Sequence, residues 1–346
     1  MPGRVDTCQF GTPARHRGYN RRQVKPALPV GVRRALWGAT WAITTVLASF
    51  AAMRLVWHDG LWLFMLGNGL TPYLYLPVWP IAAAATAARR KRLAVLAGLV
   101  AALHGYWTIT PLLPRTAAAT TGRTLRIVSA NLLMVHDNPP LLAAELDRLD
   151  ADVYFLQELS PHWDDELERR GFWSRYPFNK RLTSEDSFGT AIASRLPVRD
   201  LDVFWSAELP QMRGVLRVDD RDIALLNVHL LPPRSLDYVP YYRQGADDLV
   251  VMVKQLGANS FIVAGDFNST PDSSFVARMR GLSDDAWEAA GSGFGFTWPN
   301  GMFTLPPMRL DHVFVSPDLG VLRATLGVGL GSDHRPIIAD VARRMR

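Results

Sequence analysis

Three long apolar stretches stand near the start of the chain. The first runs from about Leu36 to Val56, the second from about Leu61 to Ala88, and the third from about Leu93 to Leu113. About 20 apolar residues in helical form cross the hydrocarbon core of a bilayer. The second stretch contains several prolines and is expected to be kinked or only partly embedded. Charged breaks separate the stretches, which favours a membrane region over 36–114 with about three transmembrane helices rather than buried helices of a soluble protein.

After this region, short apolar runs typical of strands alternate with amphipathic segments typical of helices. Segment 115–123, rich in Ala and Thr, is predicted to be a linker to a domain over 124–346. Helices are predicted over Leu141–Leu149 and Tyr241–Leu256. Strands are predicted over Leu125–Ala130, Val153–Leu156, Thr190–Ser194, Val198–Trp205, Gly214–Val218, Ile223–Val228, Phe261–Ala264, Leu310–Val315 and Pro336–Val341. Many strands with few helices between them favour a sandwich of sheets with helices outside over a doubly wound single sheet.

The charge pattern adds an orientation to this organisation. The chain has a net charge of +6 and a pI near 9.7, values that often accompany nucleic-acid binding. Here the basic residues gather in the tail over 1–35 and at Arg89–Arg92, on the flanks of the apolar stretches, so membrane topology explains them better. The positive-inside rule places both clusters in the cytoplasm and the domain after the third stretch outside. The only cysteine, Cys8, lies in the tail, so the exported part has no thiol to oxidise.

Candidate chemistry recurs where the predicted strands begin or end. These positions hold an oxygen-rich set with two histidines: Asn131, Glu158, His229, Asp266, Asn268, Asp311, Asp333 and His334. A hard cation such as Mg²⁺ prefers carboxylate and amide oxygens, whereas a zinc site more often presents several His or Cys ligands. The set therefore favours Mg²⁺, with Mn²⁺ or Ca²⁺ as alternatives, and hydrolysis of phosphate esters.

Each of these residues alone has an ordinary structural explanation. An Asn at a strand end is most often a turn former, and a single His229 is more often a packed or surface histidine. Glu158 stands just before Ser160-Pro161 and equally suits the start of a helix, because acidic groups are favourable in the first turn. Only the combination, in this order along the chain, favours a catalytic site.

That combination resembles a known family. The ordered motifs are Asn131, Gln157-Glu158, His229, GDFN at 265–268, LDHVFVS at 310–316 and SDHRP at 332–336. Together they resemble the endonuclease/exonuclease/phosphatase superfamily over essentially all of residues 122–346. The resemblance implies an α/β (α+β) fold, a four-layer sandwich of two mixed β-sheets flanked by helices, preceded here by the transmembrane region. It also implies a metal-dependent phosphoesterase.

The resemblance further implies how metal and phosphate are held. Glu158 corresponds to the main metal ligand, Asn131 lies close to metal and phosphate, and Asp333 serves a second metal position. Asn268 holds the phosphate or the metal. Arg213, which precedes a predicted strand, matches a phosphate-contacting arginine of several relatives, although a solvated surface arginine fits the sequence equally well.

Four residues acquire catalytic roles by the same resemblance. Asp266 orients or activates the attacking water, His334 contacts the scissile phosphate, and Asp311 orients His334. His229 matches a second histidine of the deoxyribonuclease and sphingomyelinase branches. Its carboxylate partner is expected, on sequence order alone, at Glu185 or Asp186.

The substrate follows less directly. Three apolar spans joined to an exported domain of this type resemble the VanJ-like teicoplanin-resistance membrane proteins. This resemblance implies a cell-envelope role in antibiotic resistance, with undecaprenyl pyrophosphate as the lipid-linked substrate. The alternatives are an extracellular nuclease, a phospholipid phosphodiesterase and a non-catalytic scaffold. No basic loop interleaved with aromatic residues suggests a DNA track in the exported part.

Overall fold

The computed structural model describes residue 3 and residues 29–113, 118–135, 139–257, 259–301, 305–329 and 331–345. Most of the predicted basic tail, and residues 115–117 of the predicted linker, lie outside the described residues. The chain divides into two compact units, Met1–Trp41 and Ala42–Arg346. The first helix, Val30–Trp57, begins in the first unit and ends in the second.

The apolar region forms five α-helices and a short 3-10 helix among the described residues. They are α1 (Val30–Trp57), α2 (Trp62–Gly69), α3 (Thr71–Leu74), α4 (Val78–Ala87), α5 (Lys91–Ile109) and η1 (Thr110–Leu112). By length and composition, α1 and α5 could each cross a membrane. The second apolar stretch forms no single helix of spanning length, because it is divided into the short helices α2, α3 and α4. Pro72 stands in the first turn of α3 and Pro77 at the N-cap of α4, and a proline inside a helix would remove a backbone hydrogen bond.

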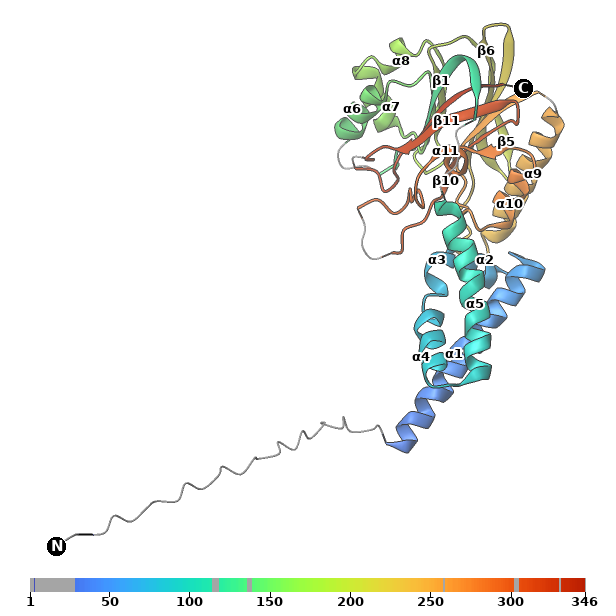
Figure 1. Ribbon diagram of the computed structural model, residues 1–346. Coiled ribbons are helices and arrows are strands. Elements are labelled where there is room, and N and C mark those ends of the chain that lie inside the picture. Colours follow the sequence, from blue (N-terminus) through green and yellow to red (C-terminus); the bar gives the residue numbers. More distant parts are fainter. Residues whose placement is uncertain are drawn as a thin grey trace. The chain divides into compact units, whose positions relative to one another are not determined.

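Two six-stranded sheets form the rest of the molecule, called here the sandwich domain (residues 120–345). The first sheet has the order β11-β12-β1-β2-β4-β3, and the second β5-β6-β7-β8-β10-β9. Strands of both are labelled in Figure 1, among them β1 and β11 of the first sheet and β5 and β6 of the second. The strands of the first sheet are β1 (Thr120–Asn131), β2 (Val153–Gln157), β3 (Phe178–Leu182), β4 (Thr190–Ser194), β11 (Leu319–Leu326) and β12 (Ile337–Arg344). Those of the second are β5 (Val198–Ser206), β6 (Leu209–Val218), β7 (Arg221–His229), β8 (Ser260–Asp266), β9 (Asp284–Asp285) and β10 (Asp311–Val315). Both sheets are mixed, because β1 and β2 are parallel, β7 and β8 are parallel, and the other pairs are antiparallel.

Three apolar cores hold four layers together. Between the sheets, Ile127 and Phe155 of the first pack with Leu225 and Ile262 of the second. The outer face of the first sheet buries α6 (Pro139–Leu149), α7 (Pro161–Arg169) and α8 (Phe172–Arg175). The outer face of the second buries α9 (Val239–Leu256) and α10 (Ser274–Arg280), while α11 (Ala286–Ala290) packs with the inner core. The predicted four-layer sandwich is therefore confirmed.

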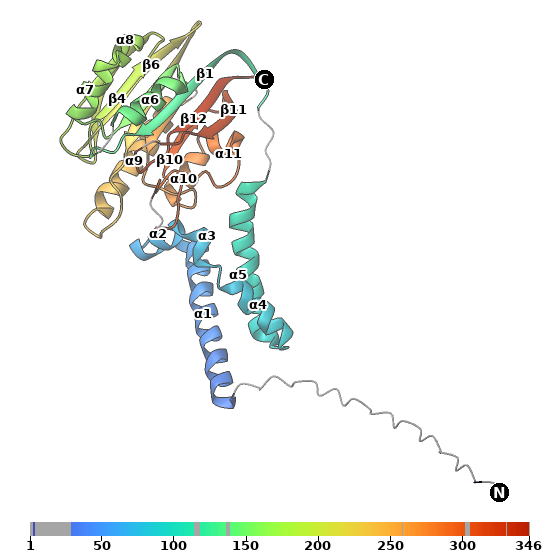
Figure 2. The ribbon, with the colours of Figure 1, turned by 90° about the vertical axis from the view of Figure 1, so that its left-hand side faces the viewer.

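The predicted elements are correct where apolar periodicity is strong and incomplete elsewhere. Strand β1 begins at Thr120, inside the predicted linker, and pairs there with Arg344 of β12 (Figure 2). Strand β3 was not predicted, because its sequence FNKRL has no apolar run and its place at the sheet edge comes from backbone pairing with β4. Backbone hydrogen bonds form strands regardless of side-chain polarity, which a hydrophobicity pattern does not detect.

A buried polar junction fixes the two sheets relative to each other. Asn227 of β7 donates from Nδ2 to the carbonyl oxygens of Leu156 and Ala191, at 2.8 and 2.9 Å, and to Thr190 Oγ1 at 2.9 Å. Its Oδ1 accepts from Gln157 Nε2 at 2.6 Å. All these partners belong to the first sheet, so one side chain joins the sheets next to the strand ends that carry the candidate site.

Replacing Asn227 with alanine is expected to lower the free energy of unfolding by about 2–4 kcal/mol, because buried carbonyl groups and the Gln157 amide lose their partners. Thermal unfolding of the full-length protein in detergent measures the change. The matched control is Asn179→Ala, which removes a single 2.8 Å bond to the Tyr176 carbonyl at the sheet edge. Equal destabilisation by the two substitutions would contradict a special role for the junction.

Candidate active site

Strand register places three predicted site residues side by side. His229 ends β7 opposite Asp266, the last residue of β8. Asp311 begins β10 opposite the same Asp266, because β10 runs antiparallel to β8. In the first sheet, Asn131 ends β1 opposite Gln157, and Glu158 follows directly. The side chains come from the ends of both parallel pairs, a common location for sites in folds with parallel strands.

The loop before β12 brings His334 to this edge. His334 Nδ1 lies 2.8 Å from Asp311 Oδ2. The loop is anchored by Ser332, whose Oγ donates to the Asn131 carbonyl at 2.8 Å and accepts from the His334 backbone N–H at 3.0 Å. The imidazole therefore has a defined orientation, with Nδ1 toward Asp311 and Nε2 toward Asp266.

Asp266 occupies the centre of the arrangement. Its Oδ2 lies 3.6 Å from the Nε2 atoms of both His229 and His334 and accepts from Asn131 Nδ2 at 3.1 Å. Asn131 Nδ2 also donates to Glu158 Oε1 at 3.0 Å. We call these residues the site cluster: Asn131, Glu158, His229, Asp266, Asp311 and His334. The structure thus joins six of the predicted residues in one place.

Backbone geometry at two strand ends supports this cluster. Gly265 has φ 152°, and a Cβ there would lie 1.8 Å from the Val228 carbonyl oxygen, so only glycine allows β8 to approach β7 so closely. Glu158 has a left-handed φ of 57° and Asn268 a φ of 47°. Residues other than glycine seldom adopt this region, and such strain gathers at functional sites. The GDFN motif therefore meets backbone requirements, at Gly265 and Asn268, as well as supplying side chains.

Burial and charge shift the protonation of the cluster. Burial raises the pKa of Asp266 above its ordinary value, against the opposing charge of His334. Burial lowers the pKa of His334, but the carboxylates of Asp311 and Asp266 outweigh this effect and raise it to about 10. In the metal-free protein, the imidazole of His334 is therefore the positively charged imidazolium at neutral pH. A cation bound beside Asp266 would oppose that charge and lower the pKa of His334.

The cluster has the donor chemistry that a divalent cation needs. One ligand atom from each of Asp266, Asp311 and His334 lies within 4.8 Å of the others, and all three residues are buried. Asp311 Oδ1 is buried without a hydrogen-bond partner among the described residues. The carboxylate of Glu158 is half-buried beside Asn131. Carboxylate oxygens in this number suit Mg²⁺ or Mn²⁺, so the residues fit a metal, although the three gathered most tightly are not the Glu158, Asp333 and Asn131 set expected from the motifs.

Two further predicted residues, Asn268 and Asp333, lie beside the cluster. Asn268 is adjacent, since its backbone N–H donates to Asp266 Oδ1 at 2.9 Å, and its Nδ2 donates to the Leu230 carbonyl at 2.8 Å. Asp333 follows the anchoring loop, but its Oδ2 accepts from the indole of Trp298 at 3.0 Å. Trp298 is therefore a neighbour of the site that the motifs did not indicate.

Arg213 is not brought into the site. Its exposed guanidinium lies 5.9 Å from the ring centre of Phe204. Side chains alternate between the faces of a strand, and Met212 points into the core between the sheets. Arg213 consequently points to the outer face of the second sheet. Of the two interpretations of Arg213, a phosphate contact and a solvated surface arginine, the structure supports the surface arginine.

Neither Glu185 nor Asp186, the expected carboxylate partners, forms a hydrogen bond with Nδ1 of His229. Asp186 accepts instead from Ser184 Oγ at 2.5 Å and from the Phe188 backbone at 2.9 Å. His229 Nδ1 is buried and has no hydrogen-bond partner within the described part of the chain. Sequence order alone could not decide this, because the loop before β4 turns back on itself through its own hydrogen bonds.

A third buried histidine, His312, lies on the far side of β10 from the site cluster. His312 follows Asp311 and points to the opposite face of β10, where its Nδ1 lies 2.6 Å from Asp285 Oδ2 and its Nε2 lies 2.9 Å from the Ser269 carbonyl. The bond to Ser269 fixes the backbone just after GDFN. The sequence contained the signal, a histidine directly after Asp311 in a strand, but alternation hides its partners until the fold is known.

Comparison with known proteins identifies the family of the chain. The model of the Endonuclease/Exonuclease/phosphatase family matches residues 128–334, and the chain belongs to that family. Its members include hydrolases of phosphoesters, and a divalent cation is general in the family. No curated protein matches the sequence.

Solved structures share the fold at low sequence identity. Truncated TDP2 from Caenorhabditis elegans is 21% identical, covers 64% of this chain and 99% of its own, and gives a TM-score of 0.53. A family protein from Beutenbergia cavernae is 18% identical over 64% of this chain and 72% of its own, with a TM-score of 0.51. One from Bacteroides thetaiotaomicron is 18% identical over 65% of this chain and 100% of its own, also with a TM-score of 0.51. At these identities the likeness establishes the fold alone.

Proposed function

We propose that this chain is a membrane-anchored, metal-dependent phosphoesterase whose site cluster hydrolyses a lipid-linked phosphate or pyrophosphate outside the cytoplasm. The specific substrate that we propose is undecaprenyl pyrophosphate. A bound divalent cation polarises a phosphate oxygen and makes a water a better nucleophile. Glu158, Asn131 and Asp266 would hold that cation, with Asp333 as a candidate for a second position.

The protein's own groups divide the remaining work. Asp266 orients the attacking water from the centre of the cluster. His334, held by Asp311, directs Nε2 toward the same point and donates a hydrogen bond to the phosphate. Donors arranged in advance around developing negative charge are a large source of rate acceleration. His229 and Asn268 border the same space and would contact the other phosphate oxygens.

One observation carries the proposal of a substrate at the membrane: the end of an apolar helix is bonded to the loop that follows the catalytic motif. Arg54 of α1, 8% exposed, forms a 2.6 Å ion pair with Asp272, six residues after Asp266. In the next turn, Asp59 accepts from the Ser274 backbone, and His58 Nε2 lies 3.0 Å from the Asp272 carbonyl. A lipid substrate and a tethered site share one surface, which raises the effective concentration of the substrate without new contacts.

The same contacts support the proposed orientation. The turn after α1 is bonded to the sandwich domain, so if α1 crosses the membrane, this turn and the domain share one side. Tyr106 and Trp107, near the end of α5, line a cavity with Asp272, whereas Arg89–Arg92 stands at the other end of α5. Arg89–Arg92 would then lie on the side of the membrane opposite the sandwich domain, as the positive-inside rule expects of a cytoplasmic basic cluster.

Phosphate release by purified full-length protein in detergent tests this function. Inorganic phosphate from undecaprenyl pyrophosphate, phosphocholine from sphingomyelin and nicked plasmid DNA are measured side by side with Mg²⁺, with and without EDTA. We expect release from the polyprenyl pyrophosphate, abolished by EDTA and by Asp266→Ala. Turnover of none of the substrates would overturn the proposal, and a reporter after residue 115 that proved cytoplasmic would overturn the orientation.

The second candidate is a nuclease. A solved relative, TDP2 from D. rerio, has been crystallised with a single-strand DNA product; it is 20% identical and gives a TM-score of 0.53. Plasmid nicking in the same assay, absent in Asp266→Ala, would favour this candidate. The membrane helices would then serve only to anchor a nuclease.

A further inference from the structure

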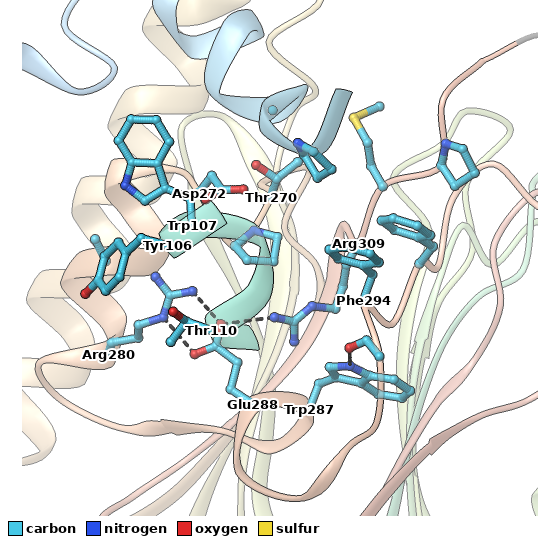
Figure 3. A pocket seen from close by; sticks show the side chains of 18 of the residues that line it. Tyr106, Trp107, Thr110, Thr270, Asp272, Arg280, Trp287, Glu288, Phe294 and Arg309 are labelled. Carbon is cyan, nitrogen blue, oxygen red and sulfur yellow. Dashed lines mark hydrogen bonds and ion pairs between the residues drawn. The ribbon is translucent and has the colours of Figure 1, made fainter. Parts of the chain in front are cut away.

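A cavity of about 470 Å³ lies where the apolar helices meet the sandwich domain (Figure 3). Arg54 of α1 and Trp107 of α5 line one part of it, and Arg280, Glu288 and Arg309 of the sandwich domain line another. None of the six residues of the site cluster is among its described lining residues. The cavity is thus separate from the proposed catalytic centre and has no role in the chemistry given above.

Arginine side chains dominate the charged part of its lining. Arg54 is paired with Asp272, and Arg280 and Arg309 share the carboxylate of Glu288, through bonds of 2.8 and 3.0 Å (Figure 3). Arg309 is also paired with Asp285, at 2.7 Å. The guanidinium of Arg280, whose side chain is 38% exposed, is therefore the lining arginine most accessible to an anionic ligand.

One of these arginines has an unused donor. Only 3% of the Arg309 side chain is exposed. Its terminal nitrogens bond Asp285 and Glu288, whereas its Nε–H is buried without an acceptor among the described residues. Asp285 lies behind the cavity wall and is also engaged by His312. A buried donor without a partner is unfavourable, so the protein's own groups leave this wall of the cavity incompletely hydrogen-bonded.

The aromatic part of the lining indicates where along the membrane normal an anionic ligand of the cavity would lie. Tyr106 and Trp107 stand in the last turn of α5, and the Trp107 ring lies 4.1 Å from the Arg54 guanidinium carbon. Trp and Tyr at the ends of apolar helices are typical of the membrane–water interface. The phosphates of lipid headgroups occupy this level. Trp287 and Phe294 extend the apolar surface on the side of the sandwich domain (Figure 3).

We propose that this cavity binds the phosphate-bearing headgroup of an anionic membrane lipid as a second ligand, separate from the phosphoester that the site cluster hydrolyses. The inference rests on the proposed membrane location but not on the identity of the substrate. Thr270 and Asp272, which follow the catalytic motif, and Arg309, which precedes Asp311 by two residues, all line the cavity. A bound headgroup would therefore contact segments that also position the site cluster.

Native mass spectrometry of the full-length Asp266→Ala protein in detergent tests this binding, because that background removes turnover. Phosphatidylglycerol is compared with diacylglycerol, which has the chains without the phosphate, and with inorganic phosphate, which has no chains. We expect saturable binding of phosphatidylglycerol only. Arg280→Gln should weaken it at least about tenfold, the scale of one charge-assisted hydrogen bond.

The chain offers a matched control on the same helix. Arg278 of α10 is similarly exposed and forms an ion pair with Asp247, outside the cavity. Arg278→Gln should leave the affinity unchanged. Ala277→Phe, at an exposed position in the lining, should weaken binding by filling space while it removes no charge.

Three results would overturn the proposal. Equal binding of diacylglycerol would show that chains, not phosphate, are recognised. Inorganic phosphate bound as tightly as the lipid would assign the cavity to a free anion. Equal affinity in Arg280→Gln and Arg278→Gln would place the lipid elsewhere. These results are distinguishable from failure of the proposed function. An active enzyme that binds no phosphatidylglycerol would contradict only the proposed lipid site. Binding of the lipid without hydrolysis of any substrate would contradict only the proposed enzymatic function.

Discussion

Asp266→Asn is expected to reduce phosphoester hydrolysis by at least about three orders of magnitude while the protein stays folded. The substitution keeps the shape of the side chain and removes the charge that lies 3.6 Å from both His229 and His334. The loss should appear in kcat, because the carboxylate acts on the attacking water rather than on substrate binding. Steady-state phosphate release at saturating Mg²⁺ and substrate measures it.

The matched control for this substitution is Asp247→Asn. Asp247 is 63% exposed and pairs with Arg278 on the surface, so its loss should change the rate by less than about twofold. Thermal unfolding of both variants verifies that they fold. If Asp266→Asn retained a rate within about tenfold of the unchanged protein, Asp266 would not be the centre of the chemistry.

Asp311→Asn is expected to lower the free energy of unfolding of the metal-free protein by about 3–5 kcal/mol near neutral pH, because it leaves a buried imidazolium without its main partner. The pKa of His334 is raised from its ordinary 6.5 to about 10 in the folded protein. A raised folded-state pKa stabilises the fold fully below the unfolded value and ceases to do so as the pH rises through the folded value. The difference between the two proteins should therefore be largest at and below about pH 6.5 and shrink toward about pH 10.

Unfolding in the presence of EDTA across this pH range measures the difference. His334→Gln provides the control background, because Asp311→Asn introduced there should lose most of the pH dependence. A difference that was independent of pH, or that grew as the pH rose, would contradict the coupling between His334 and Asp311.

The site shows how much a strand-end motif can predict. The motifs GDFN, LDHVFVS and SDHRP stand apart in the sequence. Their order along the chain led to Asp266, Asp311 and His334, which the fold brings together. The motifs did not predict the orientation of individual side chains. Arg213 was assigned to phosphate from its place before a strand, but the alternation of that strand turns it to the outer face. Glu158 suited two explanations, and the structure supports its place in the site, since Glu158 accepts from Asn131, whereas Ser160 caps α7 and Asp164 is the acidic residue of its first turn.

The apolar region illustrates the same division. Length and apolarity indicated two helices, α1 and α5, that could each cross a membrane, and these properties depend on composition alone. The break of the second stretch depended on where its prolines fell in a helical turn. Arg54 has an ion-pair partner 218 residues away, in a segment whose position follows only from the folded sandwich.

The sequence by itself determined the family, the layered fold, the apolar helices and the residue types of the site. These properties are encoded by local periodicity and by short motifs whose residues stand close together in the chain. The tertiary structure alone decided the junction at Asn227, the placement of Trp298 beside Asp333, the lack of a partner for His229 Nδ1 among the described residues and the cavity lined by Arg54 and Arg309. Each of these depends on contacts between distant segments, and such contacts are set by strand order and register, which no local pattern records.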